Sequence, residues 1–215
     1  MDVDPGLYEH IVVNDSDVHE IVSSYLFHNC YKETLESFAT STGGGRSTDN
    51  AADMEKRKRI VSFALEGNAL TAIELTEELA PGLLEHNPDL HFDLLSIHFV
   101  ELISQKKSTQ ALEFAQTKLR PFGEFKKYVE KLQDFMALLA YEEPENSPLF
   151  HLLGMEYRQH VTDNLNRAIL ANFNNPSYPA MERLLQQTVV VRQCLHHDFN
   201  KDEVPPFSLK EFLKG

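Results

Sequence analysis

Histidine is the side chain in this sequence best suited to metal binding and proton transfer, and the chain contains ten of them. His91 and His98 are seven residues apart, which places them on one face of a helix. His196 and His197 are adjacent, so on a helix they point about 100° apart and do not readily bind one metal ion. A zinc site usually needs four ligands at close spacing. The sequence therefore predicts no metal site, and we expect no other cofactor.

The remaining residue types with catalytic potential also lack a catalytic arrangement. The acid pairs Glu77–Glu78 and Glu142–Glu143 lie in polar segments and are expected on the solvated surface. The segment Gly43–Arg46 lacks the Gly-Lys-Ser/Thr ending of a phosphate-binding loop. Cys30 and Cys194 are far apart, so they predict neither a disulfide framework nor a zinc module. We therefore predict no catalytic residues and no enzymatic activity. A helical hydrolase with an unrecognised site is an alternative that only scattered histidines and acids favour.

The charge and hydropathy of the chain exclude several classes of partner. A net charge of −13 argues against general nucleic-acid binding, because phosphate contacts need Lys and Arg. No apolar run is long enough for a membrane span, and the acidic start MDVDPGLYEH is unlike a secretory signal. We expect a protein of the cytoplasm and nucleus with no small-molecule substrate. One local run of cations is a candidate nuclear import signal, with a solvated helix turn as the alternative: Lys56, Arg57, Lys58 and Arg59.

The stretch SSYLFHNCYKETLESFA predicts two short amphipathic helices with a break at Asn29–Cys30. Polar residues from Asn14 offer helix caps, and Glu20 is placed to complete a capping box. The helices place apolar and aromatic side chains at 3-4 spacing. We predict that one face of the pair carries Ile21, Val22, Tyr25, Leu26, Tyr31, Thr34, Leu35 and Phe38. The Gly-rich segment that follows, residues 41–50, predicts a flexible linker.

The rest of the chain also follows helical periodicity, and no segment shows convincing strand alternation. Asn87 and Pro88 predict the start of a well-buried helix, whose stripe is Phe92, Leu95, Phe99, Leu102 and Ile103. Pro121 is expected to end a shorter helix from Ala111. Val189–Val191 is β-branched but has helical flanks. The predicted fold is all-α, with about nine or ten helices packed mostly as antiparallel neighbours.

Three of these segments, in this order, resemble the LisH–CTLH–CRA family. YLFHNCYKETLESF resembles the LisH motif, with Tyr25, Leu26, Tyr31, Thr34 and Phe38 at its characteristic positions. Residues 59–103 resemble the CTLH motif. Its hallmarks appear as Ile60, Gly67, Ala72-Ile73, Pro81, Leu83-Leu84, Asn87-Pro88, Leu90, Phe92, Leu94 and Phe99 to Leu102. ALEFAQTKLRPF and the residues after it resemble the CRA region.

The resemblance divides the chain into a LisH helical dimerisation motif and a CTLH–CRA helical domain. The expected regions are an N-terminal arm (1–13), LisH (14–46), CTLH (52–109), CRA (110–200) and a C-terminal tail (201–215). LisH motifs commonly carry Gly where this chain has Cys30. Because Asn29 tolerates the left-handed conformation, we expect the break to survive. Four apolar residues make the tail a candidate partner-binding segment: Phe207, Leu209, Phe212 and Leu213.

The function implied by the resemblance is a non-catalytic scaffold of the multisubunit GID/CTLH E3 ubiquitin ligase. Such a subunit links RING-bearing subunits with an SPRY-bearing subunit and substrate receptors for proteasomal degradation. The resemblance also implies a homodimer through the LisH face, with packing of that face inside the same chain as the alternative. A freestanding LisH adaptor in nuclear or cytoskeletal signalling is the second functional hypothesis.

Overall fold

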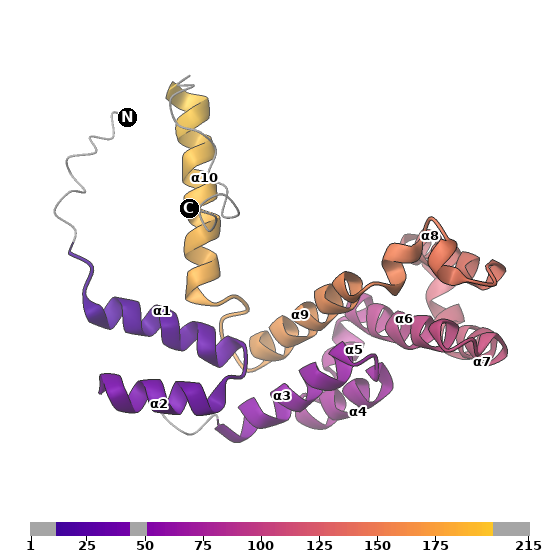
Figure 1. Ribbon diagram of the computed structural model, residues 1–215, viewed down its shortest axis with the longest axis horizontal. Coiled ribbons are helices and arrows are strands. Elements are labelled where there is room, and N and C mark those ends of the chain that lie inside the picture. The colour runs from indigo at the N-terminus through magenta and orange to yellow at the C-terminus, as the bar shows by residue number, and fades with distance from the viewer. Residues whose placement is uncertain (1–11, 44–50, 200–215) are drawn as a thin grey trace. The chain divides into compact units, whose positions relative to one another are not determined.

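A computed structural model of the chain describes residues 12–43 and 51–199. Every regular element within these ranges is a helix, which confirms the predicted all-α fold (Figure 1). None of these helices is both long enough and apolar enough to cross a membrane. The contacts divide the chain into two compact parts. We call Met1–Thr48 together with Tyr178–Gly215 the terminal unit, and Asp49–Ser177 the central unit.

The terminal unit begins with the predicted helix pair, α1 (Asp15–His28) and α2 (Lys32–Thr42), and the break falls where it was expected. The N-terminal cap of α1 differs from the prediction. The backbone N–H of Asn14 donates to the carboxylate of Asp17 at 3.2 Å. Asp17 and not Glu20 therefore completes the capping box. At the other end of the pair, Gly43 closes α2 in the left-handed conformation, with φ of 68°.

The break between α1 and α2 contains a non-glycine residue in the left-handed region. Cys30 has φ of 59° and is buried, whereas Asn29 keeps φ of −88°. The expectation that Asn29 would carry the left-handed turn is therefore wrong. Asn29 instead uses its side-chain amide to bind the carbonyl of Tyr25 at 2.9 Å, which closes the end of α1. A side chain in this conformation costs about 1 to 2 kcal/mol relative to glycine.

The third helix of the terminal unit comes from the other end of the chain. Helix α10 (Ala180–Phe199) packs against α1, and the backbone N–H of Ala180 donates to the hydroxyl of Ser24 at 3.0 Å. Val189–Val191 lies within this helix, which confirms the helical interpretation of that β-branched run. The sequence analysis grouped residues 180–199 with the preceding CRA segments. The contacts of the structure instead place α10 in the same compact unit as α1 and α2.

The central unit contains the remaining helices, joined by short turns. They are α3 (Ala51–Leu65), α4 (Ala69–Leu79), α5 (Leu83–His86), α6 (Pro88–Ser104), α7 (Ser108–Phe114), α8 (Lys126–Ala137) and α9 (Met155–Asn172). A π-helical turn (Ala115–Leu119) continues α7, and 3₁₀ turns cover Arg120–Glu124, Leu138–Ala140, Pro144–Asn146 and Phe150–Leu153. Pro121 therefore lies inside a helical turn and does not end the helical segment as predicted.

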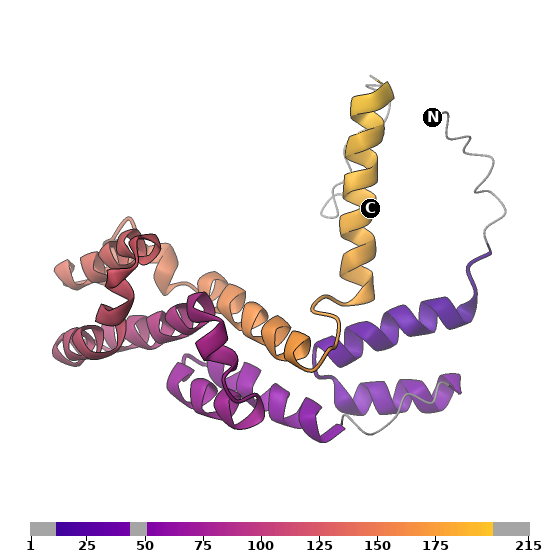
Figure 2. The ribbon, with the colours of Figure 1, turned by 180° about the vertical axis from the view of Figure 1, so that it is seen from behind.

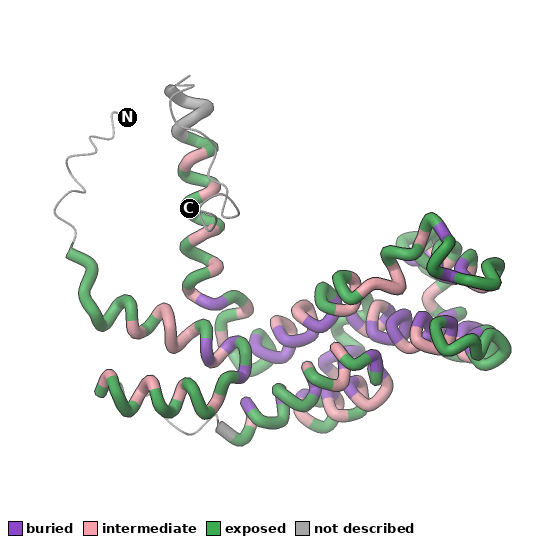
Figure 3. The backbone as a smooth tube through the Cα atoms, in the orientation of Figure 1, coloured by how far each residue is buried: buried purple, intermediate pink, exposed green. Residues whose placement is uncertain are grey.

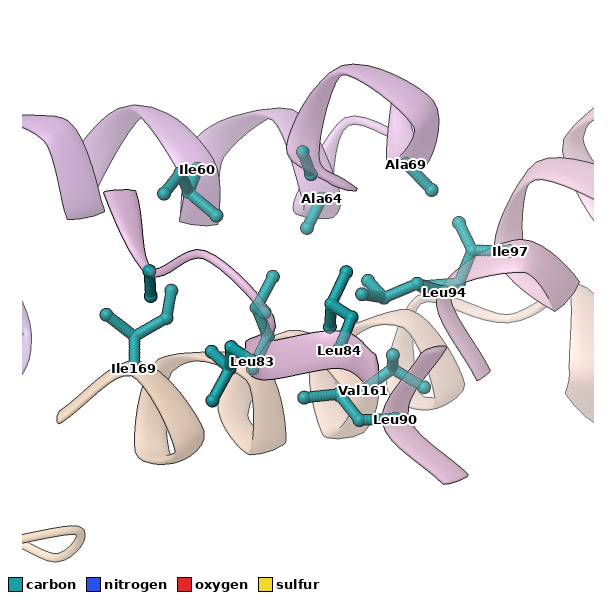
Figure 4. Packing of buried hydrophobic residues seen from close by; sticks show 13 residues of the cluster. Ile60, Ala64, Ala69, Leu83, Leu84, Leu90, Leu94, Ile97, Val161 and Ile169 are labelled. Atoms are coloured by element: carbon teal, nitrogen blue, oxygen red, sulfur yellow. The ribbon is translucent and has the colours of Figure 1, made fainter. Parts of the chain in front are cut away.

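Helix α6 carries both hydrophobic clusters of the central unit. Its residues Leu90, Leu94 and Ile97 pack with α3, α4, α5 and α9 in the first cluster (Figure 4). Its residues Phe92 and Phe99 enter a second cluster with α7, α8 and the turns between them. Figure 3 shows the resulting burial along α6 and α9. The predicted well-buried helix is thus confirmed, although the side chain of Asn87 donates back to the carbonyl of Leu83 at 2.8 Å and does not cap α6.

The strained turn at Cys30 gives a direct test of the break. Replacing Cys30 by Gly or by Ala removes the same thiol, but only Gly adopts a positive φ without steric cost. We expect Cys30→Gly to be more stable to unfolding than Cys30→Ala by about 1 kcal/mol. Urea unfolding followed by circular dichroism measures the difference. Equal stability of the two variants, or a more stable alanine variant, would contradict the assigned conformation.

Candidate interaction surfaces

His91 and His98, the two histidines expected on one face of a helix, both pack against phenylalanine rings. On α6, His91 meets the ring of Phe122 edge-on with centroids 5.9 Å apart, and His98 meets Phe114 at 4.7 Å. Burial lowers the pKa of both imidazoles below the ordinary 6.5, so the folded protein keeps them neutral near pH 7. No group of three metal-binding side chains occurs among the described residues. The side chains of His196 and His197 lie outside them.

The residues predicted for the face of the helix pair divide into three classes of exposure. Leu26 is buried, and Ile21, Val22, Leu35 and Phe38 are half-buried. Thr34 is exposed, and so are two large aromatic side chains, with Tyr25 at 45% and Tyr31 at 49%. Their ring centroids are 6.4 Å apart across the break, while His19 meets Phe38 edge-on at 5.6 Å and holds α1 against α2. Packing inside the chain therefore covers part of this face and leaves the two tyrosines open.

Helix α10 adds apolar surface that the sequence analysis did not assign to any interface. Its first turn meets α1 through Ala180, and the rest of the helix stands away from α1 in both views (Figures 1 and 2). Four of its apolar side chains are 43–52% exposed: Met181, Leu184, Val190 and Val191. The spacing of Met181, Leu184, Thr188 and Val191 is 3-4-3, the pattern of a helix that packs along another helix. This spacing is visible in the sequence and could have predicted an interaction surface on α10.

The run of four cations from Lys56 to Arg59 does not form one exposed patch. It lies within α3, where Arg57 is only 3% exposed and donates to the side-chain oxygen of Asn166 on α9 at 2.7 Å. The other three cations are exposed. In the folded chain the guanidinium of Arg57 is therefore not accessible to a receptor, and its membership of an import signal stays a prediction. Whether the three exposed cations direct import stays a prediction.

Glycine 67 lies beside an ion pair that joins three helices of the central unit. It has φ of 84° in the turn between α3 and α4. A Cβ atom there would lie 2.8 Å from the carboxylate of Glu101 on α6. That carboxylate accepts from Arg158 on α9 at 3.0 Å, and Arg158 also donates to the carbonyl of Leu65 at the end of α3 at 3.2 Å. The backbone conformation of the turn therefore favours glycine, and a Cβ atom would in addition require the Glu101 carboxylate to shift within its ion pair.

The apolar tail residues Phe207, Leu209, Phe212 and Leu213 lie outside the described residues, so their predicted contact with a partner stays a prediction. The structure nevertheless shows other exposed apolar side chains in the central unit. Phe125, Phe150 and Met155 are each well exposed at the surface of the second half of this unit. Such side chains, singly or in small groups, are ordinary on a monomer, so they do not by themselves define an interface.

Comparison with known proteins gives a consistent result over most of the chain. Residues 53–196 match the domain family described as "CTLH/CRA C-terminal to LisH motif domain". The chain is 33% identical to the "Glucose-induced degradation protein 8 homolog" of Nematostella vectensis, over 80% of this chain and 76% of that protein. It is 32% identical to the protein of the same name from Dictyostelium discoideum, over 86% and 83% of the two chains. Identity to the "Protein GID8 homolog" of Arabidopsis thaliana is 31%, over 83% and 74%.

This chain belongs to the CTLH family of glucose-induced degradation protein 8 homologues. The resemblance stated from the sequence motifs is thereby confirmed at the level of the family. The structure also gives the CTLH hallmarks a physical meaning. Gly67 and Glu101 are 34 positions apart in the chain, yet they meet at the same ion pair. Most other hallmark positions, such as Ile60, Leu84 and Phe92, are buried in the two clusters.

Substitution of the CTLH glycine tests the assigned turn. We expect Gly67→Ala to lower the free energy of unfolding by about 1 to 2 kcal/mol, because alanine is strained at positive φ and its Cβ displaces the Glu101 carboxylate. Gly123→Ala is the matched control, because its φ is not positive and its nearest side-chain atom would lie 3.4 Å from the new Cβ. Equal destabilisation by the two substitutions, measured by urea unfolding, would be inconsistent with this geometry.

The two neutral histidines of α6 predict a pH dependence of stability. Because burial lowers their pKa in the folded state, the unfolded chain binds more protons below about pH 6.5, and stability falls as the pH falls through that range. Replacing both histidines by Gln should make the drop in melting temperature between pH 7 and pH 5.5 smaller than in the unmodified protein. Asp93, whose pKa is raised by burial, contributes to both proteins and does not affect the comparison. Parallel pH profiles would refute the assignment.

Proposed function

We propose that this chain is a non-catalytic scaffold subunit of the GID/CTLH E3 ubiquitin ligase, located in the cytoplasm and nucleus. It joins RING-bearing subunits to an SPRY-bearing subunit and to substrate receptors. The observation that carries the proposal is the family match over residues 53–196, together with relatives named for glucose-induced degradation. The motif order LisH, CTLH and CRA, which resembles the scaffold subunits of this ligase, supports the same assignment.

The composition of the chain supports a scaffold over a ubiquitin-transferring subunit. A RING domain is built on zinc sites with Cys and His ligands. This chain has two cysteines in total, Cys30 is buried at a strained turn, and Cys194 is on α10. No cluster of metal-binding side chains occurs among the side chains that the structure describes. We therefore assign recruitment of the ubiquitin-charged enzyme to other subunits, which the scaffold brings into the assembly.

The terminal unit is the part of the chain that we assign to homodimerisation. Tyr25 and Tyr31 are exposed at the break of the helix pair, and α10 exposes Leu184 and Val191 on one side. Most of the stability of a helix in a protein comes from packing of its apolar face, so a helix that exposes apolar side chains gains from a second helix packed along it. Each large apolar side chain buried in such a dimer contributes about 1.5 to 3 kcal/mol. In a dimer with a twofold axis, the exposed apolar side of α10 in each copy would pack against the same side of α10 in the other copy.

A tagged copy of the chain expressed in its native cell tests the proposed function. We expect affinity purification at physiological salt, with mass spectrometry, to recover RING-bearing and SPRY-bearing CTLH proteins in fixed stoichiometry. Recovery of the chain by itself, or with unrelated signalling proteins, would overturn the ligase assignment. Imaging of the same tagged chain tests the proposed location in cytoplasm and nucleus.

The proposed dimer surface gives a separate prediction for the purified chain. At micromolar concentration, light scattering after gel filtration should give twice the mass of one chain. Leu184→Asp combined with Val191→Asp should give the mass of a single chain, because both side chains are exposed in the monomer and would be buried with a charge in the dimer. Gln193→Asp is the control, since it adds charge to α10 about 180° from Leu184. A monomeric unmodified protein, or a dimer that survives the double substitution, would contradict the assignment.

A further inference from the structure

A groove between α3 and α4 combines an apolar floor with unpaired cations at its edge. Each helix contributes three residues at spacing i, i+3 and i+4: Lys56, Arg59 and Ile60 from α3, and Leu75, Glu78 and Leu79 from α4. Ile60 is 1% exposed, while Leu75 and Leu79 are half-buried, so apolar carbon forms the base of the groove. The cavity has a volume of about 210 Å³.

Lys56 and Arg59, like several other cations of the central unit, form no ion pair with the described residues, and they differ from those others in lining an apolar groove. Lys127 pairs with Asp89 at 2.7 Å and Lys131 pairs with Asp93 at 3.2 Å. No carboxylate of the described residues lies within ion-pair distance of Lys56 or Arg59, although Glu78 lines the same groove. In a chain with a net charge of −13, two unpaired cations beside one apolar hollow form a local site for negative charge.

The local fold of α3 explains how this site arises from the run of four cations. The side chain of Arg57 turns toward α9 and bonds to Asn166, which fixes the rotation of α3 about its axis. That rotation brings Lys56 and Arg59 to the groove and leaves Lys58 exposed and away from it. Of the four consecutive cations, only Lys56 and Arg59 therefore line the groove.

We propose that the groove between α3 and α4 binds an acidic, apolar peptide segment of a partner protein. One large apolar side chain of the segment lies on Ile60, Leu75 and Leu79, and a neighbouring carboxylate lies between Lys56 and Arg59. The volume is below the range of about 300 to 1,000 Å³ typical of small-molecule sites, and it suits one or two side chains. The Glu78 carboxylate lines the same groove, and it repels a peptide carboxylate with one negative charge less than a phosphate dianion, so apolar contact with one carboxylate suits the groove better than phosphate alone. This site does not depend on the ligase assignment.

Selection from a displayed library of random peptides of about twelve residues, panned on the full-length protein, tests the proposal without a known partner. Enriched peptides should combine Asp or Glu with a large apolar residue. Arg59→Glu should weaken their binding by about tenfold or more, since it removes a charge-assisted contact and adds repulsion. Lys58→Glu is the matched control, with the same change of charge at an exposed neighbour that does not line the groove, and it should leave affinity within about twofold.

The affinities are measured by fluorescence anisotropy on variants whose circular dichroism shows an unchanged fold. If Arg59→Glu does not fold, Arg59→Gln removes only the cation and should still weaken binding. Replacement of the acidic residue of a selected peptide by Gln or Asn should have a similar effect. The proposal is overturned if no peptide is enriched, if the enriched peptides lack acidic residues, or if the substitutions at Arg59 and Lys58 weaken binding equally.

Discussion

The structure of the central unit depends on the burial of one helix on nearly all of its sides. Helix α6 has nine buried residues within Pro88–Ser104. Leu90, Leu94 and Ile97 belong to one cluster, whereas Phe92, Leu95, Phe99, Val100 and Ile103 belong to the other. A helix buried in this way lacks a polar stripe and is stable only inside a larger helical body. The helices before and after it in the chain are therefore held in place by the same element.

Polar contacts at the edge of these clusters fix which helices surround α6. The ion pair of Glu101 with Arg158 connects α6 to α9, and the second bond of Arg158 reaches the end of α3. Asp89 and Asp93, one turn apart on α6, bind Lys127 and Lys131, one turn apart on α8. The Asp89–Lys127 pair is exposed and adds little stability, whereas the Asp93 carboxylate of the second pair is largely buried, and together the two pairs orient α8 on α6. A body with a fixed register can present its surfaces to other proteins in a constant arrangement, as a scaffold requires.

The sequence predicted the helices well because their apolar residues recur at 3-4 spacing, and the stripe from Phe92 to Ile103 is the clearest case. It predicted the position of the break after α1 but not its conformation. Cys30 occupies the left-handed region because the chain reversal requires it, although Asn29 has the better intrinsic preference. The burial of Arg57 was also missed, since its partner Asn166 is 109 residues away and local periodicity contains no information about such a contact. The packing of α10 on α1 was missed for the same reason.

In the proposed scaffold role, the chain contributes to ubiquitin transfer by assembly and not by chemistry. The most direct test compares ubiquitin transfer to a substrate in three purified reactions that contain the same activating and conjugating enzymes. The first contains this chain alone, the second contains the other ligase subunits without it, and the third contains the complete assembly. The account predicts transfer above background only where RING-bearing subunits are present, and the fastest transfer in the complete assembly. Transfer by the chain alone, or an unchanged rate when it is left out of the assembly, would contradict the account.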